Sequence, residues 1–151
     1  MANLLLSGWL AASFNLLTTE LNTLANGAYA ISTVAGSSGV LDNGSNKYPN
    51  CHVEFLAGGN YTPLANGYIP IWLLESLDGT NYDDGSASIV PARRPDITIS
   101  VRAGTTITPR GQAKGLLMPQ GLYKVLAANM TGATFPSSGN VIVARPGTVA
   151  I

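Results

Sequence analysis

The chain of 151 residues contains one cysteine, one histidine and few charged residues. A single thiol, that of Cys51, excludes an internal disulfide and a thiolate-rich metal site. Charged residues make up 11% of the chain, and eight basic residues balance eight acidic ones. Nucleic-acid binding is disfavoured, because it needs clustered Lys and Arg and the only adjacent basic pair is Arg93-Arg94. A neutral, charge-poor chain is instead typical of a protein that lives in an assembly.

Recognisable catalytic and metal-binding patterns are also missing. Cys51 and His52 are adjacent in a predicted strand, where neighbouring side chains point to opposite faces, so a Cys-His nucleophile pair is not expected. Neither a G-x-S-x-G elbow nor a phosphate-binding glycine loop occurs. Residues 78–84 are rich in oxygen ligands but lack the spacing of an EF-hand calcium loop. We therefore expect no enzyme, no cofactor and no bound metal.

Long apolar runs are absent as well. The first nineteen residues are uncharged, but Ser7 and Gly8 interrupt them, and a membrane span needs about 18 consecutive apolar residues. No basic residue precedes Lys47, whereas a secretory signal needs positive charge near its start. These features predict a soluble chain without a membrane partner, which begins with an uncharged apolar arm over residues 1–12.

The arm leads into a segment with helical spacing. Apolar side chains recur every three or four residues from Phe14 to Leu24, which predicts an amphipathic helix over residues 13–25. Ser13 can serve as its N-cap, and Asn26-Gly27 can end it. Such a helix could pack on its own sheet or on a neighbouring subunit, and the sequence leaves both open. We therefore expect an arm and helix over residues 1–34, ahead of a β-rich body over residues 35–151, in one compact domain.

The body shows short strand-like segments separated by Gly, Pro and Asn-Gly turn signals. Strands are predicted over residues 51–56, 68–77, 96–102, 122–127 and 141–145, with weaker candidates at 29–34 and 86–90. In the third of these, Ile97, Ile99 and Val101 should face the core and alternate with outward polar residues. Many short strands with one helix predict an all-β fold, an antiparallel, jelly-roll-like β-sandwich.

Residues 68–85, YIPIWLLESLDGTNYDDG, join a strand to a polar turn. Both faces of the strand are largely apolar, as in a strand inside a sandwich or under a partner. Asp78 should accept backbone hydrogen bonds across the turn, and Gly79 tolerates positive φ. Tyr82 should pack beneath the turn, which makes this segment structural.

Several segments together resemble a group of small tailed-bacteriophage virion proteins. They are LTTELNTLANGA at 17–28, YIPIWLLESLDGTNYDDG at 68–85, PARRPDITISVRAG at 91–104, PQGLYKVLAANMTGA at 119–133 and the closing SGNVIVARPG. The resemblance implies a β-sandwich on the outside of a virion assembled in the host cytoplasm, a capsid decoration or cement protein that stabilises the head shell. Its implied partners are the major capsid protein and copies of itself, as a homotrimer. Residues 1–12 depart from the pattern.

Two features are candidates for an interface in such an assembly, the apolar arm and the basic pair. The candidate residues are Leu4, Leu5, Leu6, Trp9, Leu10, Phe14, Arg93 and Arg94. The two arginines fit either a solvated turn or ion pairs with carboxylates of another subunit. An alternative function is a tail, neck or head-fibre component that binds a host receptor or glycan. The aromatic residues that could stack on a sugar are Trp9, Trp72, Tyr61, Tyr68 and Tyr82, although Trp72 lies mid-strand and is expected in the core.

Overall fold

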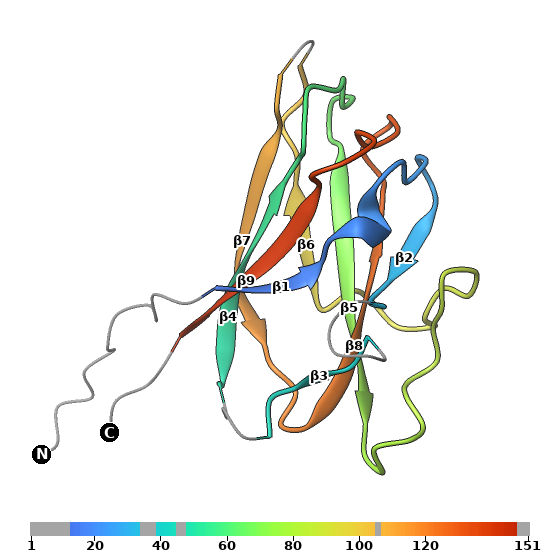
Figure 1. Cartoon of the computed structure of the whole chain (residues 1–151), viewed down its shortest axis with the longest axis vertical. Helices are drawn as coiled ribbons and strands as arrows, with labels where there is room; N and C mark the ends of the chain where they lie inside the picture. The colour runs from blue at the N-terminus through green and yellow to red at the C-terminus, as the bar shows by residue number, and fades with distance from the viewer. Residues whose placement is uncertain (1–12, 34–38, 45–47, 105–106, 148–151) are drawn as a thin grey trace, which may run out of the picture.

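The computed structural model describes residues 13–33, 39–44, 48–104 and 107–147, which form two antiparallel sheets packed face to face (Figure 1). Sheet A contains, in spatial order, β1 (Phe14–Leu17), β9 (Val141–Gly147), β4 (Asn50–Leu56) and β7 (Arg110–Leu117). Sheet B contains β2 (Tyr29–Ile31), β8 (Leu122–Ala128), β5 (Tyr68–Ser76) and β6 (Ile97–Ser100), and β3 (Leu41–Asp42) also pairs with β8. The predicted all-β sandwich is confirmed.

The strand order is that of a jelly roll. Leaving aside the two-residue β3, the chain places β1 in sheet A, β2 in sheet B, β4 in A, β5 and β6 in B, β7 in A, β8 in B and β9 in A. The resulting orders, β1-β9-β4-β7 and β2-β8-β5-β6, are two interlocked Greek keys. At one edge of the sandwich, β6 and β7 approach so closely that a Cβ added to Gly111 would lie 2.5 Å from the Ser100 carbonyl oxygen.

The main core lies between the two sheets. Val53 and Phe55 of β4 and Ile69 and Ile71 of β5 are completely buried, because alternate side chains of each strand face inward. The ring of Phe55 stacks on Phe135, with centroids 4.9 Å apart. Phe135 belongs to the β8–β9 connection, so this connection helps to close one end of the core.

A second, smaller apolar cluster lies on the outer face of sheet B. Trp72 and Leu74 of β5 pack there with Leu126 and Ala128 of β8. The long connection between β5 and β6, residues 77–96, covers this cluster, and Trp72 Nε1 donates to the Arg93 carbonyl oxygen at 3.1 Å. The apolar character of both faces of β5 therefore arises within one chain, from the core on one side and the covering connection on the other.

The predicted helix over residues 13–25 is wrong. Phe14–Leu17 forms the edge strand β1, which pairs with β9, and a short 3-10 helix, η1 (Thr19–Leu21), follows it. A register shift between Asn15 and Leu17 interrupts the alternation of β1, and both Leu16 and Leu17 are buried. The apolar spacing that imitated a helix thus comes from a bulged strand and a tight turn.

The strong strand predictions are confirmed as β4, β5, β6, β8 and β9, and the segment at 29–34 as the shorter β2. The weak strand at 86–90 is wrong, because the Ser86 hydroxyl accepts hydrogen bonds from the Ser88 and Ile89 N–H groups and closes a turn. The sequence reading missed β1, β3 and β7. Since β1 and β2 belong to the two sheets, residues 14–31 are part of the sandwich, whereas residues 1–12 lie outside the described residues.

Candidate functional site

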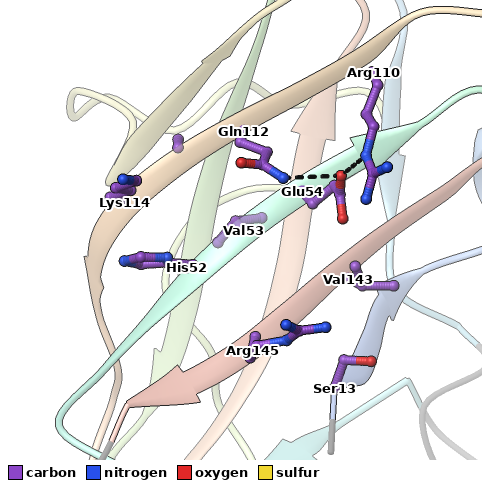
Figure 2. A pocket seen from close by; sticks show the side chains of 10 residues that line it. Ser13, His52, Val53, Glu54, Arg110, Gln112, Lys114, Val143 and Arg145 are labelled. Carbon is purple, nitrogen blue, oxygen red and sulfur yellow. Dashed lines mark hydrogen bonds and ion pairs between the residues drawn. The ribbon is translucent and has the colours of Figure 1, made fainter. Parts of the chain in front are cut away.

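A polar groove of about 320 Å³ lies on the outer face of sheet A (Figure 2). We name it the sheet A groove. It is lined by Ser13, His52, Val53, Glu54, Arg110, Gln112, Ala113, Lys114, Val143 and Arg145. Three neighbouring strands, β9, β4 and β7, supply almost all of these residues, so the groove is built on a rigid sheet.

Strand alternation places the charged side chains on this face. Cys51 and Val53 are completely buried, so His52 and Glu54, which alternate with them on β4, face outward. His52 is paired across the ladder with Arg145 of β9. The same alternation on β7 exposes Arg110, Gln112 and Lys114 on the side of the groove opposite β9.

A β-bulge in β7 brings Lys114 next to His52. Cys51 pairs with Leu116 and Val53 with Ala113, so Lys114 and Gly115 together oppose the single residue His52. Gly115 has φ of 80°, a conformation that glycine adopts without strain. Burial and the nearby positive charge of Lys114 lower the pKa of His52, which favours its neutral form.

Glu54 is the only carboxylate among the lining residues of the groove. It accepts hydrogen bonds from Arg110 Nε and, at 3.1 Å, from Gln112 Nε2, both across the β4–β7 ladder. The hydrogen bond from Arg110 is the largest cause of a lowered Glu54 pKa, which burial opposes, and the charges of Arg110 and Arg145 add to it. Glu54 therefore stays ionised and neutralises one of the cations of the groove.

The groove keeps an excess of positive charge. Three of the eight basic residues of the chain, Arg110, Lys114 and Arg145, surround the single carboxylate of Glu54. Figure 2 shows Lys114 and His52 at one end of the groove and Arg110 with Glu54 at the other, with Arg145 nearer to Ser13. Guanidinium and ammonium groups held on a sheet in this way are suited to bind carboxylates of a protein partner.

The sequence reading did not identify the groove. The groove depends on β7, and the sequence does not predict this strand because Pro109, Arg110 and Gly111 indicate a turn. The alternation of long polar side chains at Arg110, Gln112 and Lys114 with small residues between them was the available signal. Gly111 is buried at the approach of β6, where the Ser100 carbonyl oxygen leaves no room for a side chain.

Of the predicted interface residues, Phe14, Arg93 and Arg94 lie in the described part of the chain. Leu4, Leu5, Leu6, Trp9 and Leu10 lie outside the described residues. Phe14 is partly buried and packs against the main core. Phe14 is the first residue of β1, and the residue before it, Ser13, lines the groove.

The basic pair divides into a bound and an exposed arginine. Arg93 donates through Nη2 to the Leu73 carbonyl oxygen at 2.7 Å and through Nη1 to Asp96 at 2.7 Å, and it lies 3.5 Å from Asp83. Arg93 therefore holds the covering connection to β5. Arg94 is exposed and takes part in none of the hydrogen bonds or ion pairs found between described residues.

The turn after β5 has the geometry of a side-chain-capped turn. Asp78 Oδ1 accepts hydrogen bonds from the N–H groups of Thr80 and Asn81 at 2.8 and 2.7 Å, and Gly79 has φ of 77°. The amide of Asn81 donates to Asp78 Oδ2 at 2.7 Å, and these bonds, those from the backbone first, lower the pKa of Asp78. The ring of Tyr82 is partly buried, with Lys124 Nζ 4.5 Å from its centroid.

The aromatic side chains considered for sugar stacking differ in their exposure. Trp72 and Tyr61 are 5% and 9% exposed and belong to the two apolar clusters. Trp9 lies outside the described residues. Tyr68 is 43% exposed and lines a groove of about 290 Å³ with Leu64, Met130 and polar neighbours that include Asn26 and Asn66. Tyr68 is thus the only exposed residue among the four described candidates.

The thiol and imidazole of the adjacent Cys51 and His52 lie on opposite faces of sheet A, and burial raises the pKa of Cys51 to about 12. Across the described parts of the chain, no three His, Cys, Asp or Glu side chains are grouped so that they could hold a metal ion. Within the same residues there is no helix with the length and apolar character needed to cross a membrane. Comparisons with protein-family models, curated proteins and solved structures found no match.

Proposed function

We propose that this chain is a non-enzymatic structural protein of a tailed-bacteriophage virion, a decoration or cement protein that binds and stabilises the head shell. Its partners in this proposal are the major capsid protein and other copies of the chain, arranged as a homotrimer. The resemblance of five sequence segments to small virion proteins supports it, as does the low content of charge. Jelly rolls occur in viral capsid proteins but also in lectins and cupins, so the fold alone does not decide the function.

The position of Ser13 is the observation that carries the proposal. Ser13 is exposed, precedes the edge strand β1 and lines the sheet A groove (Figure 2). The twelve uncharged residues before it are therefore joined to an outer face of the sandwich, beside cationic side chains. Apolar segments that a partner covers contribute to binding roughly in proportion to the area removed from water, at about 25 cal/mol per Å². In our proposal, Leu4, Leu5, Leu6, Trp9 and Leu10 make this contact with the shell.

The test is the binding of purified chain to head particles that lack it. We expect the full chain to bind in stoichiometric amounts and to raise the melting temperature of the particles. A variant without residues 2–12 should keep its melting temperature and circular dichroism spectrum but bind the particles at least tenfold more weakly. A second variant, with residues 2–12 replaced by a Gly/Ser segment of equal length, should behave like the truncated chain. Unchanged particle binding by both variants would contradict the proposed role of the arm.

A host- or glycan-binding component of the tail, neck or head fibre is the second candidate. The groove around Tyr68 favours it, because an exposed tyrosine ring beside Asn26 and Asn66 offers a stacking face with hydrogen-bonding groups. It is the weaker candidate, because Trp72 and Tyr61 are covered by the chain itself. Binding of the chain to immobilised host-surface glycans, lost in Tyr68→Ala and retained in the truncated chain, would favour this function over the first.

A further inference from the structure

The charges of this neutral chain are unevenly distributed between two opposite faces. The sheet A groove carries Arg110, Lys114 and Arg145 against Glu54. The segment from Glu75 to Asp96 carries five of the eight acidic residues of the chain against Arg93 and Arg94, and Lys124 of β8 lies over the ring of its Tyr82. This segment includes the connection that covers the outer face of sheet B, so the acidic region lies on the other side of the sandwich from the basic groove (Figure 1).

The acidic connection is held in a fixed shape. The Asp78 turn fixes its beginning. Its end is fixed by the hydrogen bond from Trp72 Nε1 to the Arg93 carbonyl oxygen and by that from the Leu73 N–H to the Asp96 carboxylate. Between them, Asp83 N–H donates to the Glu75 carbonyl oxygen at 3.0 Å. A preorganised segment loses little conformational freedom on binding, which favours its use as a contact surface.

The connection also exposes apolar side chains next to its carboxylates. Ile89 and Val90 are each about half exposed, at 51% and 50%, and Leu77 is completely exposed. Asp83 and Asp84 are exposed in the same connection, and the Asp84 carboxylate takes part in none of the ion pairs found between described residues. Exposed aliphatic side chains surrounded by charge are typical of a protein contact surface, with an apolar centre and a polar rim.

We propose that copies of this chain associate head to tail, with the sheet A groove of one copy receiving the acidic β5–β6 connection of the next. Lys114 and Arg145 bind carboxylates that include Asp83 and Asp84, and Ile89 and Val90 pack against the sheet. The two contact surfaces are different and lie on opposite faces, so the interface is heterologous and continues as an open chain. The proposal goes beyond the proposed function, because it adds a contact between copies that a closed homotrimer does not use.

Two charge-reversed variants of the full chain test this proposal. One carries Lys114→Glu and Arg145→Glu in the groove, and the other carries Asp83→Lys and Asp84→Lys at the connection. In head-to-tail association, each variant alone presents two surfaces of like charge, whereas a mixture presents complementary pairs throughout. We expect light scattering at low salt to give an oligomer for the wild type, the monomer mass for each variant, and an oligomer again for their equimolar mixture.

The controls separate this contact from other causes. Arg102→Glu, an exposed change outside both surfaces, should leave the oligomer mass unchanged. Circular dichroism melting shows whether each variant is folded, and a salt series of the wild type, from about 0.05 to about 0.5 M, gives a measurement that needs no variant. Dissociation of the wild type with rising salt supports the proposal. A monomeric wild type at low salt, charge-reversed variants that keep the oligomer mass, or a mixture that stays monomeric would each overturn it.

These measurements use no head particles, so their outcome does not depend on the proposed function. A chain that binds particles through residues 2–12 but stays monomeric in solution would refute the head-to-tail contact and leave the cement role standing. A chain that forms salt-sensitive oligomers but ignores the particles would do the reverse.

Discussion

Thr33 donates two hydrogen bonds to one oxygen of Glu20, from its backbone N–H at 2.7 Å and from its hydroxyl at 3.0 Å. The other oxygen of Glu20 accepts the N–H of Thr18 at 2.9 Å. Burial alone would raise the pKa of Glu20, but these hydrogen bonds outweigh it and lower the pKa to about 2. Glu20 thus ties η1, which follows β1 of sheet A, to Thr33, which lies just after β2 of sheet B.

The first prediction concerns the acid stability of this link. Because the pKa of Glu20 is lowered from 4.5 to about 2 on folding, its stabilisation is present above pH 4.5 and is lost as the pH falls towards 2. Glu20→Gln should therefore be less stable than the wild type at pH 7, by about 1 kcal/mol, since charge-assisted hydrogen bonds are weakened. The difference should shrink as the pH falls through this window.

Urea unfolding at a series of pH values measures this difference. Glu75→Gln is the matched control, because Glu75 is exposed and its carboxylate accepts none of the hydrogen bonds found between described residues. A difference between Glu20→Gln and the wild type that stays constant from pH 7 to pH 2 would show that ionised Glu20 does not provide the link.

The second prediction separates the two adjacent arginines. Arg93→Ala removes the hydrogen bond to the Leu73 carbonyl oxygen and the ion pair with Asp96. Because the side chain is partly exposed, we expect a loss of only about 1 kcal/mol in the free energy of unfolding. Arg94→Ala, with the same change in charge, should stay within about 0.5 kcal/mol of the wild type. Equal effects of the two changes in urea unfolding would contradict the assignment of Arg93 as the residue that holds the connection.

The strand pattern explains why most of the sandwich could be predicted and the groove could not. Strands β4, β5, β6, β8 and β9 contain β-branched or aromatic residues in alternation, which identifies a strand that covers a core. Strand β7 contains Gly111, Ala113 and Gly115 instead, because it lies against β6 and carries a bulge. Without β7, nothing in the sequence brings Arg110 and Lys114 next to Glu54 and His52.

The apolar residues after Ser13 predict a helix where the structure has β1 and η1, and the reason is related. Leu17, Leu21 and Leu24 repeat at helical spacing, but their environments differ. Leu17 is buried by strand pairing with β9 and Leu21 by a single 3-10 turn. Long-range pairing with a strand more than 120 positions later decided the conformation, and local spacing carries no information about such a partner.

The third prediction tests the close approach of β6 and β7. A Cβ at position 111 would lie 2.5 Å from the Ser100 carbonyl oxygen and 2.6 Å from Ile99 Cγ2. Gly111→Ala should therefore force the two strands apart and cost about 1–3 kcal/mol in the free energy of unfolding. Gly121→Ala is the control, because nothing lies within 4 Å of a Cβ there, and it should leave stability unchanged or raise it slightly. A thermal melt of Gly111→Ala that coincides with that of Gly121→Ala would refute the close contact.

The fourth prediction concerns the connection that covers sheet B. Trp72 is 5% exposed and anchors this connection through the hydrogen bond from Nε1 to the Arg93 carbonyl oxygen. Trp72→Phe keeps most of the apolar contact but loses the donor, which should cost about 1 kcal/mol, whereas Trp72→Ala should cost about 3–5 kcal/mol. The loss should also free the connection locally, so trypsin should cleave after Arg93 faster in Trp72→Ala than in the wild type.

Tyr68→Ala is the control for both measurements, because Tyr68 lies on the same strand but is 43% exposed, whereas Trp72 is buried. It should change stability and the rate of cleavage after Arg93 only slightly. If Trp72→Ala lost stability without faster cleavage, Trp72 would support the sheet but not the covering connection. That result would also weaken the head-to-tail proposal, because the acidic surface depends on a connection that Trp72 holds in place.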